Sequence, residues 1–203
     1  MNILVTGGSS GLGKSIVKKL CSNKKYKVYF TYNNSIENSK KICFKYSNAH
    51  GIKCDFTNKR ELNEFIENFK NLNINILINN FYCWPKNPLL PGTFLTKNFH
   101  KIDKNVFIDE FYNNIIPTII ITQEAIKHFR KKKYGKIITV LSSFLNSPTI
   151  GSSIYISSKN YLKGLTKVWA VENVKFNISS NTISPSFMLT PHTLKMDQRL
   201  NKN

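Results

Sequence analysis

The sequence has little arginine, few acidic residues and no long hydrophobic run, and these shortages narrow the partners that the protein can have. Its 203 residues include three arginines and 27 lysines against 11 acidic residues, for a formal charge of +19. Such a charge suits a nucleic-acid partner, but base and phosphate recognition favours the arginine fork, and these lysines are scattered. We therefore expect no nucleic acid as a partner, and instead a positive field that attracts anionic cofactors and substrates.

Cysteine and histidine are also sparse. The four cysteines show no CxxC pair and no metal-ligand spacing, and the four histidines are dispersed, which predicts reduced thiols and no metal site. The apolar run at 115–121 is broken by Pro117 and Thr118, so it is too short to cross a membrane. The first residues lead into a strand without the basic region of a signal peptide. We expect one cytoplasmic domain spanning residues 1–203, with no membrane contact.

Apolar runs and helical spacings alternate along the chain. The sequence predicts strands at 2–6, 27–32, 51–56, 75–79, 136–141 and 176–183. It predicts helices at 14–21, 35–46, 58–71, 109–132 and 152–174. Pro117 should kink the fourth helix near Asn113 or Asn114. This alternation predicts an α/β fold, a Rossmann-like doubly wound parallel sheet with helices on both faces.

A glycine-rich turn follows the first expected strand. Gly7, Gly11 and Gly13 stand between that strand and the helix at 14–21, which is the arrangement of a phosphate-binding turn. Glycines let the backbone approach a pyrophosphate, and the helix N-terminus offers unpaired N–H groups. A merely tight turn is the alternative interpretation of the same residues.

Tyr155 and Lys159 lie four residues apart, which on a helix places both side chains on one face. A neighbouring ammonium lowers the pKa of a phenol, so the pair is a tunable acid. In a chain with nine tyrosines and 27 lysines, chance alone produces such pairs. A second one, Tyr82 and Lys86, is interrupted by Pro85. The interpretation of Tyr155 and Lys159 as an acid pair therefore depends on the motifs around them. The alternative interpretation is an amphipathic helix with a solvated lysine.

That context is an ordered set of motifs. TGGSSGLG stands at 6–13, Asp55 near the end of the third strand, Asn79-Asn80 after the fourth, an asparagine in the kinked helix, a serine after the fifth strand, and then Tyr155-x-x-x-Lys159. Together these motifs resemble the classical short-chain dehydrogenase/reductase (SDR) family over nearly the whole chain. Their glycine spacing differs from that of the extended sugar-nucleotide epimerases.

The resemblance implies a role for each matching residue. Tyr155 would be the general acid or base, with Lys159 lowering its pKa and holding the nicotinamide ribose. Ser142, thirteen residues before Tyr155, would bond the substrate oxygen, and Asn114, a better match than Asn113, would serve the proton relay. The residues that the resemblance assigns to the cofactor are Gly7, Ser9, Ser10, Gly11, Leu12, Gly13, Asn33, Asp55, Phe56, Asn79, Tyr155, Lys159, Pro185 and Thr190.

The second strand bears on the cofactor, because it ends in residues 30–35 without an acid for the ribose 2′-hydroxyl. This favours NADP(H) over NAD(H). The implied activity is that of a carbonyl reductase (ketoreductase) or alcohol dehydrogenase that transfers hydride to or from a small carbonyl or hydroxyl substrate. The resemblance also implies a homodimer, built through the helices at 109–132 and 152–174.

Three departures from the family pattern motivate an alternative function. Phe81 and Tyr82 stand where the family has two small residues, and Ser186 stands where it has a glycine. The chain also stops thirteen residues after Thr190, before the family's substrate-covering helix and last strand. We therefore expect a sheet without that strand. The alternative is a catalytically impaired dinucleotide-binding relative with a regulatory or structural role.

Overall fold

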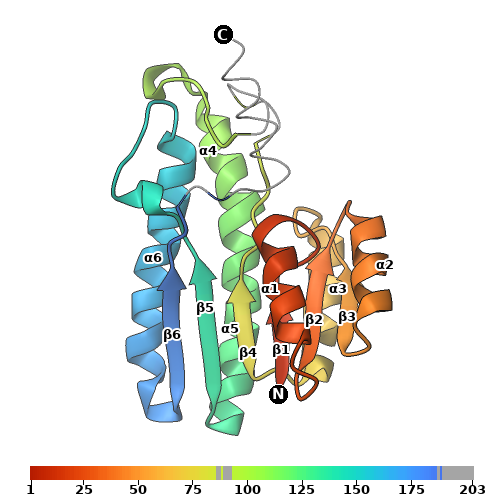
Figure 1. Cartoon of the computed structure of the whole chain (residues 1–203). Helices are drawn as coiled ribbons and strands as arrows, with labels where there is room; N and C mark the ends of the chain where they lie inside the picture. Colours follow the sequence, from red (N-terminus) through yellow and green to blue (C-terminus); the bar gives the residue numbers. More distant parts are fainter. Residues whose placement is uncertain (86–87, 89–92, 187, 189–203) are drawn as a thin grey trace.

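A computed structural model gives the structure of the chain and describes residues 1–85, 88, 93–186 and 188. Six parallel strands form one sheet in these residues, in the order β3-β2-β1-β4-β5-β6 (Figure 1). The strands are β1 (Asn2–Val5), β2 (Lys27–Tyr32), β3 (Ala49–Lys53), β4 (Ile76–Asn79), β5 (Gly135–Val140) and β6 (Ile178–Ile183). The predicted α/β fold is confirmed.

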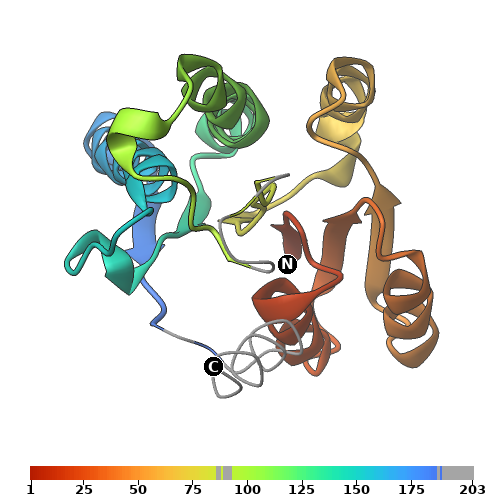
Figure 2. The ribbon, with the colours of Figure 1, turned by 90° about the horizontal axis from the view of Figure 1, so that it is seen from above.

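Helices cover both faces of the sheet. They are α1 (Gly11–Cys21), α2 (Ile36–Lys45), α3 (Lys59–Phe69), α4 (Lys104–Glu110), α5 (Ile116–Lys132) and α6 (Ser153–Asn173). Seen from above, α1 and α2 lie on one face, and α3, α5 and α6 lie on the other (Figure 2). The sheet is therefore doubly wound. No helix among the described residues is long and apolar enough to span a bilayer.

The two larger apolar clusters of the described residues follow from this layering. On the α1 and α2 side, Val17 and Ile42 pack with Val5 and Phe30 of the sheet. On the other side, the helices contribute Phe65, Phe129 and Trp169, which pack with Leu77 and Ile137. Strands buried on both faces read as continuous apolar runs, which is why the sequence reveals them.

The chain changes direction across the sheet at β1, which pairs with β2 on one side and β4 on the other. Ligands of open α/β sheets bind at the carboxyl ends of the strands, beside such a switch point. The glycine loop after β1 and the segment after β4 meet there. The fold thus places several of the predicted motifs at one edge.

The third strand was predicted at 51–56, but β3 lies at Ala49–Lys53. It pairs with β2 from Val28 to Tyr32, and the Cys54 N–H ends this ladder by donating to the Tyr32 carbonyl at 2.8 Å. The partner strand therefore sets the end of β3. The sixth strand also begins later than predicted, at Ile178, after a left-handed Asn177 (φ 56°).

The long helix predicted at 109–132 is two helices, α4 and α5, joined by a π-helical turn at Phe111–Ile115. This π-helical turn stands where the kink near Asn113 and Asn114 was predicted, and Pro117 has no N–H to continue the ladder. The start was predicted too late, because α4 begins at Lys104. There the Asp103 side chain accepts a hydrogen bond from the Asn105 N–H at 2.7 Å.

Candidate active site

The turn from β1 into the first residues of α1 needs glycine for two different reasons. A Cβ at Gly13 would collide with the Gly7 carbonyl and lie 2.6 Å from the Asn80 amide nitrogen. Gly11 has a φ of +49°, and a Cβ there would meet nothing within 4 Å. Ser10 makes no side-chain cap on α1, and its first turn carries no acid. Open space above uncapped N–H groups suits an anion such as a pyrophosphate.

Asn80 ties this loop to the end of β4. Its amide nitrogen donates to the Thr6 and Gly7 carbonyls, each at 3.0 Å, and its backbone N–H donates to the Thr6 hydroxyl at 3.0 Å. Asn80 belongs to the Asn79-Asn80 motif, for which the family resemblance assigned a role to Asn79 alone. The consecutive asparagines after an apolar strand were the available signal.

Two residues expected at the cofactor have side chains that face the core. Asn79 is buried, and its amide donates to the Thr122 hydroxyl of α5 at 2.9 Å. Phe56 is buried too, with its ring 5.4 Å from that of Phe65 and 5.1 Å from that of Phe81. Of these two residues, only the backbone lies at the carboxyl edge of the sheet, where a cofactor would bind.

The other cofactor candidates follow the carboxyl edge of the sheet. Half-buried Asn33 succeeds β2, and further along the chain the Asn38 side chain accepts a hydrogen bond from the Lys14 ammonium at 2.9 Å. Asp55 accepts two hydrogen bonds from Thr57, at 2.7 and 2.9 Å. Ser9, Ser10 and Leu12 belong to the glycine loop and the start of α1, Pro185 follows β6, and Thr190 lies outside the described residues.

Lys159 is buried on α6, with 4% of its surface exposed. Its ammonium donates to the Val140 carbonyl at 3.1 Å, at the end of β5. Burial lowers the pKa of Lys159 from 10.5 to about 8, and the Glu110 carboxylate opposes this shift. Lys159 can therefore gain or lose a proton near neutral pH.

Tyr155 lies on the same face of α6, one turn earlier. Burial raises the pKa of its phenol above 10, a hydrogen bond from Ser142 lowers it, and Glu110 raises it again. Ser142 directly follows Leu141, and its hydroxyl also accepts from the Phe144 N–H at 3.3 Å. The serine and the phenol therefore face one another.

Aromatic rings enclose Tyr155. Phe94 stacks on it at 4.2 Å between centroids, and Tyr82 meets it edge-on at 5.2 Å. The Lys159 ammonium lies 5.0 Å from the centroid of Tyr82. Of the two large residues that depart from the family pattern, Phe81 joins the core while Tyr82 covers Lys159.

Thr96 fixes the position of Phe94. Its N–H and hydroxyl both donate to the Gly151 carbonyl, at 2.8 and 3.1 Å. Gly151 has a φ of +78°, and a Cβ there would collide with the Thr96 carbonyl. This clip holds part of the long loop after β4 against the start of α6.

Asn114 lies in the π-helical turn and clamps the segment after β4 from the other side. Its side-chain oxygen accepts from the Cys83 N–H at 2.6 Å, and its amide nitrogen donates to the Cys83 carbonyl at 3.0 Å. The same nitrogen donates to Glu110 at 2.9 Å. The structure thus gathers all four predicted catalytic residues around the end of β5 and the Tyr82–Cys83 segment. Glu110 and Phe94 were not among the predicted site residues, and Tyr82 was noted only as a departure from the family pattern.

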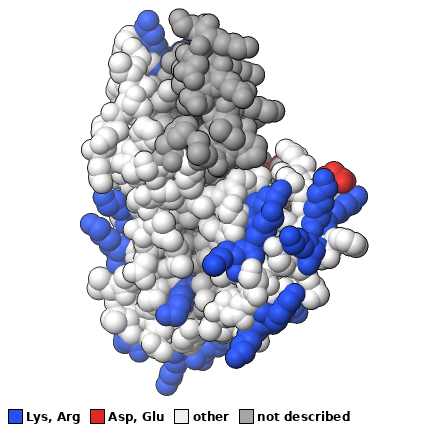
Figure 3. All heavy atoms as spheres, viewed as in Figure 1, with Lys and Arg blue, Asp and Glu red and all other residues white. Residues whose placement is uncertain are grey.

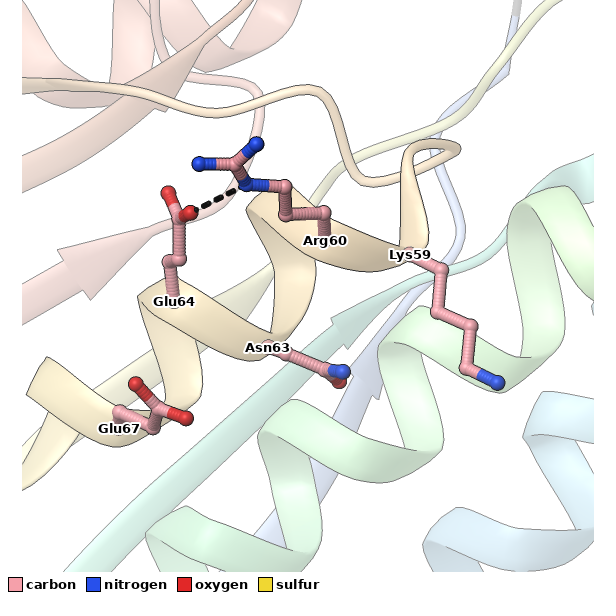
Figure 4. Close-up of a pocket in the computed structure, with 5 residues that line it drawn as sticks. All are labelled: Lys59, Arg60, Asn63, Glu64 and Glu67. Carbon is pink, nitrogen blue, oxygen red and sulfur yellow. Dashed lines mark hydrogen bonds and ion pairs between the residues drawn. The ribbon is translucent and has the colours of Figure 1, made fainter.

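A shallow hollow of about 560 Å³ lies elsewhere, on the exposed side of α3 (Figure 4). It is lined by Lys59, Arg60, Asn63, Glu64 and Glu67. The ion pair between Arg60 and Glu64, at 2.9 Å, is exposed to solvent and contributes little. None of the predicted catalytic residues lines this hollow, and we assign no role to it.

Comparison with known proteins decides the family. The model of the family described as short chain dehydrogenase matches residues 1–201. This chain belongs to the short-chain dehydrogenase family. The dehydrogenase is 26% identical over 204 residues to the 3-oxoacyl-[acyl-carrier-protein] reductase FabG of Aquifex aeolicus (strain VF5), covering 97% of this chain and 77% of that protein. It is 31% identical over 202 residues to carbonyl reductase family member 4 of Xenopus laevis, covering 98% and 80%.

Solved structures agree with the fold of this short-chain dehydrogenase. The structure titled "ElxO with NADP Bound" superposes with a TM-score of 0.81 at 26% identity, covering 100% of this chain and 79% of that one. A short chain dehydrogenase/reductase family protein gives a TM-score of 0.82 at 22% identity, covering 97% and 78%. The resemblance stated from the motifs is confirmed.

Proposed function

We propose that this short-chain dehydrogenase is an NADP(H)-dependent carbonyl reductase or alcohol dehydrogenase with Tyr155 as its acid or base. The observation that carries the proposal is the meeting of Tyr155, Lys159 and Ser142 at the strand ends, beside a glycine loop that fits a pyrophosphate. Two relatives are named as reductases of carbonyl compounds. Residues 1–203 would form a single dinucleotide-binding domain.

The chain's own residues would divide the chemistry between them. The nicotinamide would supply or accept the hydride. Tyr155 would give its phenolic proton to the carbonyl oxygen, and the Ser142 hydroxyl would donate to that same oxygen as charge develops. The Lys159 ammonium would stabilise the phenolate left on Tyr155. Asn114 would hold the Cys83 segment in place.

The choice of NADP(H) rests on the end of β2 and on charge. Tyr32 to Ser35 contain no acid, and the Lys14 ammonium lies beside Asn38 on α2. Lysines spread over the face of α1 and α2, with few acidic groups among them (Figure 3). An extra phosphate on the adenosine ribose would meet a positive field there. Thermal stabilisation by NADPH should exceed that by NADH, and the reverse order would contradict this choice.

We also propose a cytoplasmic homodimer. Tyr161, Val168 and Val171 form an exposed apolar row on α6 beside Gly164, the kind of surface that a partner helix covers. The expected mass by light scattering is twice 23.4 kDa, and a monomer would refute it. The structure holds reduced thiols at Cys21, Cys43, Cys54 and Cys83.

A second candidate is a relative that binds dinucleotide without turnover. The Tyr82 ring favours it, because this ring covers the Lys159 ammonium that would hold the nicotinamide ribose. One experiment separates the two functions. NADPH oxidation is followed against a panel of carbonyl compounds that includes a 3-oxoacyl thioester, with Tyr155→Phe as the control. Tyr155-dependent turnover supports the reductase, whereas NADPH-induced thermal stabilisation without it supports the second candidate.

A further inference from the structure

Glu110 is a buried acid that the proposed chemistry does not use. It ends α4 and is 9% exposed. One carboxylate oxygen accepts from the Asn114 amide at 2.9 Å. The other, Oε1, is buried without a hydrogen bond of good geometry among the described residues. An ionised carboxylate buried in this way lowers the stability of the fold unless neighbouring groups interact favourably with its charge.

The groups that face Glu110 come from the segment after β4 and from α6. Burial raises the pKa of Glu110, and interactions with the Ser158, Asn114 and Tyr82 side chains and with the Lys159 charge counter that rise. The Ser158 hydroxyl itself donates to the Tyr155 carbonyl at 2.9 Å. In return, Glu110 raises the pKa of Lys159, of Tyr155 and of Tyr82. All three effects have one sign, since each keeps a proton on a group around the proposed reaction centre.

We propose that Glu110 is a positioning residue of this site, a buried carboxylate that fixes the Tyr82–Cys83 segment through Asn114 and interacts electrostatically with Lys159 and Tyr155. The proposal rests on the function proposed above, in which Tyr155 gives a proton to the substrate. Without the carboxylate, Lys159 and Tyr155 would both lose their protons at lower pH. The alkaline limb of carbonyl reduction would then move to lower pH.

The test compares Glu110→Gln, which keeps the shape and removes the charge, with Asp109→Asn, which removes the exposed acid beside it. Proteins are labelled with ¹³C at the lysine Cε, and chemical shifts are followed against pH without cofactor. Lys159 is the resonance that titrates near pH 8 and disappears in Lys159→Met. The pH profile of NADPH oxidation is measured beside it.

We expect Glu110→Gln to move the Lys159 titration and the alkaline limb of kcat to lower pH, and Asp109→Asn to move neither. An unchanged Lys159 titration in Glu110→Gln overturns the proposal. If the unmutated protein turns over no carbonyl, the proposed function fails, but the lysine titration still decides the role of Glu110.

A second measurement needs no variant at Glu110. With ¹³C at the glutamate carboxyl carbons, one resonance of the unmutated protein should respond near pH 8 in step with Lys159, because the two charges interact. This response should vanish in Lys159→Met. A carboxyl spectrum without such a response also overturns the proposal.

Discussion

Replacing Lys159 with methionine should stabilise the protein at pH 7 while it abolishes turnover. Burial lowers the pKa of Lys159 from 10.5 to about 8. At about 1.4 kcal/mol per pKa unit, keeping this charge buried costs about 3 kcal/mol below pH 8. Methionine leaves the Val140 carbonyl without the ammonium at 3.1 Å, a loss of about 1 kcal/mol. The net gain is about 2 kcal/mol, which raises Tm by about 4–8 °C in a domain of this size.

The difference in stability between the unmutated protein and Lys159→Met should depend on pH, and the pKa shift of Lys159 sets the direction of that dependence. The pKa of Lys159 is lower in the folded than in the unfolded protein, so the unfolded state binds more protons between about pH 8 and 10.5. The stability of the unmutated protein therefore rises relative to the variant across this window. The free-energy difference should change by about 3 kcal/mol by pH 10.5, which turns the variant's advantage of about 2 kcal/mol at pH 7 into a deficit of about 1 kcal/mol.

Urea unfolding at pH 7 and pH 10.5 measures this change. Lys167→Met, which removes an exposed lysine from the same helix, serves as the matched control. The reasoning is refuted if the free-energy difference between the unmutated protein and Lys159→Met is the same at both pH values.

The remaining predictions concern the glycine loop and the serine. Gly13→Ala should lower the Tm of the protein without cofactor, because its methyl group collides with the Gly7 carbonyl. At Gly11 the methyl group of alanine meets no protein atom, so Gly11→Ala should cost only about 1 kcal/mol of backbone strain. Because the methyl group would enter the space assigned to the pyrophosphate, this variant should instead weaken NADPH binding in a fluorescence titration. Equal losses of Tm in the two variants would contradict the distinction. Ser142→Ala should lower kcat for carbonyl reduction by about 10²-fold with little change in NADPH affinity, and an unchanged kcat would remove Ser142 from the mechanism.

The parallel α/β sheet and the glycine-rich turn could be predicted from the sequence because they depend on local patterns. Apolar runs mark the strands, and Gly7, Gly11 and Gly13 mark the turn from β1 into α1, which begins at Gly11. The third strand was misplaced because its position depends on pairing with β2, which fixes Ala49 opposite Val28. Such non-local pairing leaves no trace in a five-residue stretch.

The residues missed around Tyr155 share a different cause. Asp109 and Glu110 are adjacent acids, and the sequence cannot tell which of them is buried. The π-helical turn at Phe111–Ile115 decides this, because it changes which residues share a face across the kink. Likewise, Phe81 and Tyr82 are both departures from the family pattern, and the sequence does not distinguish them. In the structure the Phe81 ring packs against Phe56 in the core, whereas the Tyr82 ring lies over Lys159.

The energetics of Lys159 also weigh on the choice between the two proposed functions. A protein that only bound dinucleotide through its glycine loop would gain about 2 kcal/mol by replacing the ammonium, since apolar substitutes for buried charges are often stabilising. This chain instead buries Lys159 under the Tyr82 ring and places a second costly charge, Glu110, where it keeps the first one protonated. Perturbed, mutually coupled groups of this kind cluster where proton transfer requires them. The stability lost by burying Lys159 and Glu110 therefore favours a protein that turns over substrate over one that only binds a dinucleotide.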